Sequence, residues 1–99
     1  MFRHVVMFTW SDDVDDGHVA AVSAALDGLS AAIPEIVAYR HGPDAGLSDG
    51  NHDYVVVGDF ESADDYVTYR DAPVHTDFIR DLIAGRVASR AAVQYAVER

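Results

Sequence analysis

Asp59-Phe60-Glu61-Ser62, followed by Tyr69-Arg70-Asp71-Ala72-Pro73-Val74-His75-Thr76-Asp77-Phe78, is the stretch of sequence that decides the fold. The first four residues have the pattern of a strand end followed by a helix cap, because a serine hydroxyl can accept a hydrogen bond from the first helical turn. The proline then separates a short helix from a second one, since proline is well tolerated only in the first turn of a helix. Tyr69 and His75 lie on either side of this break, and both side chains can bind a ligand or move a proton.

Hydrophobic periodicity predicts the remaining elements. Phe2 to Trp10 carries apolar side chains on both alternating faces, which is typical of a strand that is covered on both sides. Residues 19 to 33 repeat apolar side chains at three- and four-residue steps, which predicts an amphipathic helix that ends at Pro34. The other expected segments are a strand at Ile36 to Arg40, a surface loop at His41 to Asp53, and strands at Tyr54 to Phe60 and Ala91 to Val97.

The order β-α-β-β-α-α-β predicts an α+β, ferredoxin-like unit in which helices cover one face of a four-stranded antiparallel sheet. The first and third predicted strands are nevertheless apolar on both sides. A monomer would therefore expose Val5, Met7, Val55 and Val57 to water, whereas burying each such side chain is worth roughly 1.5–3 kcal/mol. We expect one domain over residues 1–99 that forms a homodimer, with two sheets packed face to face as an α/β barrel.

Composition excludes several classes of site and partner. The chain has 99 residues, of which 49% are hydrophobic, which suits one soluble globular domain. The absence of cysteine excludes disulfides, thiolate metal sites and cysteine nucleophiles. A formal net charge of −10 repels nucleic acid and anionic membranes, so we expect neither as a partner. With no segment of transmembrane length and no signal-peptide pattern, we expect a cytoplasmic protein.

The motifs resemble those of the stress-responsive dimeric α/β-barrel (Dabb) family, whose members often read Phe-Glu-Ser, then Tyr, then His-Pro-x-His-x-x-Phe. The resemblance spans nearly the whole chain and is most specific from Tyr69 to Phe78. Further matching positions are His4, Ile33-Pro34, Gly42-Pro43 and Asn51-His52-Asp53-Tyr54. One position departs from the pattern, because Ala72 stands where many members have the first histidine; the second is His75.

The family resemblance implies a dimeric barrel and a candidate site. The family contains proteins of unknown activity, stress-induced proteins that assemble into larger particles, and a polyketide cyclase that makes olivetolic acid. Matched onto this chain, the residues of that cyclase imply His75 and Tyr69 as a catalytic pair for an intramolecular aldol condensation. They also imply that His4 lines the same pocket and that neither a metal nor a cofactor is needed.

The chemistry of these side chains suits such a reaction. An aldol closure needs a base that removes a proton next to a carbonyl, and imidazole serves this purpose near neutral pH. It also needs a donor for the oxygen that gains negative charge, which a phenol supplies. We expect the pocket to lie between the sheet and the helices and to bind its substrate through His4, Val6, Phe8, Val56, Phe78 and Leu82.

Three classes of function are compatible with the sequence. The first is a dimeric barrel whose pocket binds a small apolar or aromatic molecule without turnover. The second is a cofactor-independent enzyme, with more motif support for a polyketide cyclase than for a small monooxygenase of the related antibiotic-biosynthesis barrels. The third is a structural or assembly role, in which His75 and Tyr69 are core residues. His41, His52 and Asp53 would form a metal site only if the loop folded them together.

Overall fold

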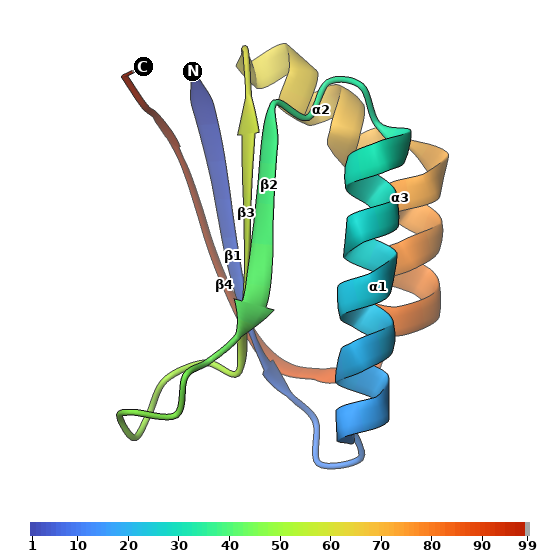
Figure 1. Ribbon diagram of the computed structural model, residues 1–99, viewed down its shortest axis with the longest axis vertical. Helices are drawn as coiled ribbons and strands as arrows, with labels where there is room; N and C mark the ends of the chain where they lie inside the picture. The colour runs from blue at the N-terminus through green and yellow to red at the C-terminus, as the bar shows by residue number, and fades with distance from the viewer. Residues whose placement is uncertain (99) are drawn as a thin grey trace.

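The computed structural model describes residues 1–98 and contains one four-stranded antiparallel sheet (Figure 1). Its strands are β1 (Phe2–Trp10), β2 (Ala38–Pro43), β3 (Tyr54–Phe60) and β4 (Val87–Ala96), in the spatial order β2-β3-β1-β4. Its helices are α1 (Asp16–Ala32), α2 (Ala63–Asp71) and α3 (Pro73–Phe78), the last continued by the π-helical turn η1 (Ile79–Ile83). The prediction of a ferredoxin-like α+β unit is confirmed.

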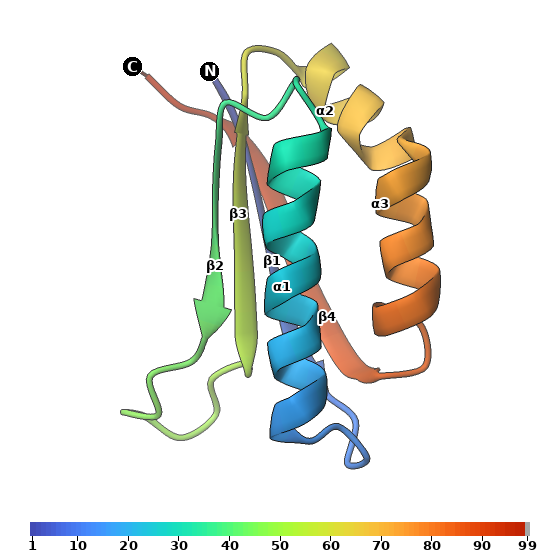
Figure 2. The same cartoon turned by 45° about the vertical axis from the view of Figure 1, so that its right-hand side comes forward.

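The helices form a single layer on one face of the sheet. Figures 1 and 2 show α1 and α3 side by side along the strands, with α2 across one end of the layer. The hairpin loop between β2 and β3 projects from the opposite end. The other face of the sheet therefore carries no helix within residues 1–98.

The core lies between the sheet and the helix layer. In β1 the alternate residues His4, Val6 and Phe8 are buried, as the period of a strand requires. Val6 pairs with Val56 of β3, so both side chains point into the same layer. From the helix side, α1 adds three almost completely buried residues, Val22, Leu26 and Leu29.

The two helices that flank the Pro73 break begin as the sequence predicts. The Ser62 side chain caps α2 by accepting a hydrogen bond from the backbone N–H of Asp65, over 3.2 Å. Pro73 lies in the first turn of α3, where its missing N–H costs no hydrogen bond. The chain changes direction between them, and this turn brings Tyr69 and His75 together with ring centroids 4.5 Å apart.

Two strands, β2 and β4, differ from the prediction in their bounds. β2 begins at Ala38 and continues to Pro43, three residues into the expected loop, because His41, Gly42 and Pro43 pair with the first residues of β3. A proline is acceptable there because β2 is an edge strand. β4 begins at Val87, since β1 is long enough to pair with it from Trp10 onwards. The residues near its start are partly polar, so the hydrophobic pattern of the sequence did not predict this part of the strand.

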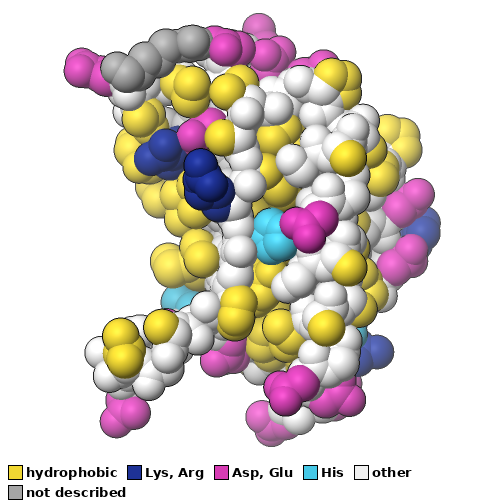
Figure 3. All heavy atoms as spheres, in the orientation of Figure 1, with side chains coloured by type: hydrophobic (Ala, Val, Ile, Leu, Met, Phe, Trp, Pro, Cys, Tyr) yellow, Lys and Arg dark blue, Asp and Glu magenta, His cyan; other side chains and the backbone are white. Residues whose placement is uncertain are grey.

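The helix-free face of the sheet is apolar at its centre. Val5 pairs with Val57 on one side and Val93 on the other, which makes a row of valines across three strands. Val93 and Tyr95 are 56% and 46% exposed, respectively. Figure 3 shows hydrophobic side chains on this side of the molecule, at the left, and acidic ones mainly elsewhere. We call this surface, defined by Val5, Met7, Val55, Val57, Ala91, Val93 and Tyr95, the open sheet face.

Within residues 1–98, no helix is both long enough and apolar enough to cross a bilayer.

Candidate functional site

A cavity of about 260 Å³ lies between the sheet and the α2–α3 segment. Seven of the eight residues that the sequence analysis assigned to a site contribute to its wall: His4, Val6, Phe8, Val56, Tyr69, His75 and Phe78. The remaining wall residues are Leu26, Tyr39, Tyr66, Arg70, Ile79, Ile83, Val87 and Arg90. The wall is therefore mostly apolar and aromatic, with a few polar groups, which is typical of a small-molecule site.

Leu82 does not lie in the cavity wall, and Ile83 takes the place expected for it. The cause is the π-helical turn η1, in which the N–H of Ala84 bonds to the carbonyl of Ile79, five residues earlier. This wider turn adds a residue to the helix and shifts the inward face by one position. The carbonyl of Leu82 instead accepts a hydrogen bond from His18 Nε2 of α1, over 2.8 Å.

His75 has one ring nitrogen fixed by the backbone. Its Nδ1 lies 2.9 Å from the carbonyl oxygen of Arg70, which can only accept, so Nδ1 carries the proton of the neutral ring. The other nitrogen, Nε2, then has a free lone pair. It makes no hydrogen bond, and no buried side-chain nitrogen within residues 1–98 lacks a partner, so Nε2 reaches accessible space. Burial lowers the pKa of His75, which keeps the ring neutral at pH 7.

His4 is held in the opposite tautomer. The side-chain amide of Gln94 on β4 donates to His4 Nδ1 over 2.9 Å, so the neutral ring carries its proton on Nε2. This N–H makes no hydrogen bond to the protein, and no buried side-chain nitrogen within residues 1–98 lacks a partner, so the N–H reaches accessible space. The site thus combines a histidine that can accept a proton and a histidine that can donate a hydrogen bond.

Two tyrosines share a short hydrogen bond at the cavity. The hydroxyl groups of Tyr69 and Tyr39 lie 2.6 Å apart, and together they have two O–H groups but only one mutual bond. One O–H is therefore available to a ligand. Burial raises the pKa of Tyr69 to about 12 and raises the pKa of Tyr39 further. Both phenols are neutral at pH 7, so they act as donors and not as bases.

Sequence reasoning missed four polar or aromatic wall residues, Tyr39, Tyr66, Arg70 and Arg90. Tyr39 faces the helices from edge strand β2, and Arg90 faces them from β4, opposite Phe8. Tyr66 lies one helical turn before Tyr69, and its ring centroid is 4.9 Å from that of His4. Tyr66 had a usable signal, the three-residue spacing to Tyr69, whereas the positions of Tyr39 and Arg90 depend on the β2 and β4 registers, which the sequence analysis did not predict.

The loop histidines do not come together. His41 bonds to Tyr54 and Asp27, over 2.8 and 2.7 Å, whereas His52 bonds to Thr9 over 2.9 Å. Asp53 accepts from the backbone of Trp10 instead. Across residues 1–98, no group of three or more histidine, aspartate or glutamate side chains is arranged to hold a metal ion.

Comparison with known proteins agrees with the fold described above. The sequence model of the stress responsive A/B barrel domain, Dabb, matches residues 2–97. The chain belongs to the Dabb family. No protein with a curated description matches it.

Several solved structures share the Dabb fold of this chain. A dimeric ferredoxin-like protein of unknown function from Thermobifida fusca is 42% identical, with a TM-score of 0.90 over 97% of this chain and 90% of that one. A Dabb family protein from Mesorhizobium loti is 19% identical, with a TM-score of 0.81 over 99% and 97% of the two chains. A hydroxynitrile lyase from Passiflora edulis is 16% identical, with a TM-score of 0.85 over 98% and 93%. At these two lower identities the likeness extends to the fold alone.

The buried histidines of this Dabb domain predict a loss of stability in mild acid. Burial, with help from Arg90 and His75, lowers the pKa of His4 to about 4, against about 6.5 for an unfolded chain. As the pH falls between these values, the unfolded chain takes up a proton that the folded protein refuses, so folding is disfavoured. We expect the free energy of unfolding to fall by on the order of 2 kcal/mol between pH 7 and pH 4.5, measured by urea denaturation.

A His4→Gln variant is the control for this pH dependence. It should lose less stability than the wild type over the same pH range, because glutamine does not titrate. Asp59 does not interfere, since Arg3 holds the pKa of its carboxyl below the ordinary value and outside this window. An equal pH dependence in the two proteins would contradict the assignment to His4.

Proposed function

We propose that this Dabb protein is a homodimer whose cavity is the active site of a cofactor-independent enzyme that moves a proton next to a ketone, as in an intramolecular aldol cyclisation. The observation that carries the proposal is the state of His75. Its Nδ1 is committed to the Arg70 carbonyl, its unprotonated Nε2 has no hydrogen-bond partner, and the residue lies in the wall of a mostly apolar cavity. A neutral imidazole held in this way is suited to general-base catalysis near pH 7.

The proposed reaction needs only groups that line the cavity. His75 Nε2 takes a proton from the carbon next to one carbonyl, and the electron pair of that C–H bond passes into an enolate. The enolate carbon then attacks a second carbonyl carbon of the same molecule, which forms the C–C bond and leaves an alkoxide. The alkoxide receives a proton from the imidazolium, so protons and electrons balance without a cofactor.

A neutral donor of the cavity would stabilise the oxygen that gains charge. The free O–H of the Tyr39–Tyr69 pair is a hydrogen-bond donor at pH 7. Donors that are already oriented before the reaction lower its barrier more than mobile water does. The apolar wall formed by Val6, Phe8 and Val56 would strengthen these interactions by excluding water.

For the assembly, we propose a second copy of this chain against the open sheet face. The support is the apolar character of that face, together with the dimeric state of the T. fusca protein at 42% identity. The stabilisation from burying apolar side chains grows with the area removed from water, and in a dimer each copy would cover the open sheet face of the other. A stable interface of this kind buries more than about 1,000 Å² in total.

The proposed activity can be tested with a simple aromatic ketone. The protein is incubated with 4-phenyl-2-butanone in D₂O, and proton NMR follows the loss of the signals next to the carbonyl. We expect exchange at least about 100-fold faster than with free imidazole at the concentration of active sites, the lower end of the effect of a positioned base.

Two other results would decide against catalysis. If the ketone binds but exchanges no faster than with free imidazole, the cavity is a binding site without turnover. If the ketone neither binds nor exchanges at millimolar concentration, a small-molecule role for the cavity is wrong. The wild-type protein inactivated by heat serves as the blank for both measurements.

A further inference from the structure

Arg90 is the charged group of the cavity that no carboxylate neutralises. It lies on β4, pairs with Phe8 of β1, and faces the helix layer together with the other residues of the cavity wall. The charge of Arg90 acts on His4, which is neutral or positive but never negative. The second arginine of the wall, Arg70, differs because it makes two hydrogen bonds to Asp71, of 2.9 and 3.2 Å.

The absence of a carboxylate beside Arg90 is unusual for this chain. Acidic residues number 17 against seven basic ones, so a carboxylate partner is readily available to an arginine. Four other described arginines form ion pairs: Arg3 with Asp59, Arg70 with Asp71, Arg80 with Asp77 and Asp81, and Arg86 with Asp13. Arg40 lies on the open sheet face, where its charge acts on Asp59. Within residues 1–98, only Arg90 combines a place in the cavity wall with the lack of an acidic partner.

A second donor lines the same cavity as Arg90. The Nε2–H of His4 reaches accessible space, and Gln94, four residues after Arg90 on the same inward face of β4, holds His4 in this tautomer. Arg90 and His4 thus supply a positive charge and an N–H donor to the wall of one mostly apolar cavity, and the charge of Arg90 acts on His4. An anion with an apolar body matches both features, because a guanidinium binds carboxylate oxygens through several N–H groups.

We propose that Arg90 selects ligands that carry a carboxylate, so that the molecule taken up by the cavity is an apolar or aromatic carboxylic acid. Arg90 and His4 bind the carboxylate, and the apolar body extends toward Phe78 and His75 along the cavity. This inference rests on the proposed function, since it names the substrate class of the same site. It assigns to Arg90 a role in binding and not in the proton transfer itself.

The experiment compares two probes of equal size that differ in charge. Isothermal titration calorimetry at pH 7.5 measures the binding of 2-naphthoate and of 2-naphthamide, its neutral counterpart, to the purified protein. For the wild type we expect 2-naphthoate to bind about tenfold more tightly than 2-naphthamide. The difference in affinity is smaller than a buried ion pair would give, because Arg90 is exposed to solvent. The preference should become smaller as salt is added.

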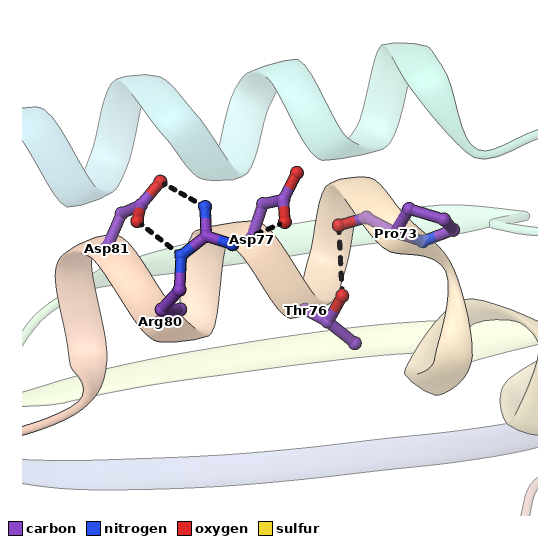
Figure 4. Close-up of polar contacts among 5 residues, drawn as sticks. All are labelled: Pro73, Thr76, Asp77, Arg80 and Asp81. Carbon is purple, nitrogen blue, oxygen red and sulfur yellow. Dashed lines mark hydrogen bonds and ion pairs between the residues drawn. The ribbon is translucent and has the colours of Figure 1, made fainter.

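Three variants separate charge from packing. Arg90→Gln should remove the preference for 2-naphthoate and leave the binding of 2-naphthamide unchanged, whereas Arg90→Lys should retain part of it. Arg80→Gln is the matched control, because it removes the same charge from the outer side of α3 and η1, where Arg80 is bound to Asp77 and Asp81 (Figure 4). Arg80 is not part of the cavity wall, so the Arg80→Gln variant should behave as the wild type.

Each outcome distinguishes this inference from the proposed function. Equal binding of both probes by the wild type, or a preference that survives in Arg90→Gln, would overturn the role of Arg90 and leave the proton-transfer site intact. Failure of both probes to bind at millimolar concentration would overturn both proposals. If Arg90→Gln does not fold, as judged by circular dichroism, Arg90→Lys and the salt dependence of the wild type still decide the question.

Discussion

Replacing His75 by alanine should reduce the rate of ketone proton exchange by about 10²–10⁴-fold, which is the usual worth of a positioned general base. Among residues 1–98, His75 is the one histidine of the cavity wall whose Nε2 is unprotonated, because the proton of the neutral ring sits on the Nδ1 that bonds to Arg70. The rate is measured by proton NMR with 4-phenyl-2-butanone in D₂O. Binding of 2-naphthamide to the same variant should change little, since the apolar wall is retained.

Two further observations separate catalysis from a structural role of His75. The His52→Ala variant removes a histidine that bonds to Thr9 outside the cavity wall, and its exchange rate should equal that of the wild type. A merely structural His75 would show a lower melting temperature in the alanine variant, with the exchange rate of the folded protein unchanged. The lost hydrogen bond to Arg70 alone should cost about 1 kcal/mol of stability. An undiminished rate in folded His75→Ala protein would refute the assignment of the base.

The parts of the fold that sequence reasoning predicted well are those with strong periodicity. β1 and β3 have the predicted bounds, because each alternates over a long run and packs on the sheet's inner face. The serine cap of α2 and the proline start of α3 are local signals that need no tertiary context. β2 and β4 were misjudged at their ends, because pairing with a long neighbour extended them through residues of weak strand preference.

The candidate site shows the same difference between residues placed by local signals, which were predicted, and residues placed by sheet register, which were not. Tyr69 and His75 are close in the sequence, so the helix break alone brings their rings together. Tyr39 and Arg90 reach the cavity from the two edge strands, and their positions depend on sheet register, which no local pattern specified. Leu82 was assigned by counting α-helical turns, a count that fails where η1 adds one residue.

A Val5→Asp variant should convert the proposed dimer into a monomer. Val5 lies at the centre of the open sheet face, between Val57 and Val93, so a second copy would enclose it. A carboxylate there would be buried without a partner in both subunits, which costs about 4 kcal/mol or more and weakens association at least about 10³-fold. Light scattering at micromolar concentration should give twice the chain mass of 10.8 kDa for the wild type and one chain mass for the variant.

A change of the same kind on the helical side tests whether the face or merely the added charge matters. Val67 is 39% exposed on α2 and lies outside both the open sheet face and the cavity wall, so Val67→Asp should remain dimeric. Far-UV circular dichroism establishes whether each variant is folded. If Val5→Asp does not fold, Val93→Asp, on an edge strand, provides a second probe of the same face. A wild-type protein that is monomeric and folded at micromolar concentration would rule out the pairing. A folded Val5→Asp variant that keeps the dimer mass would instead place the interface elsewhere, because a carboxylate cannot be buried at that position without weakening the contact.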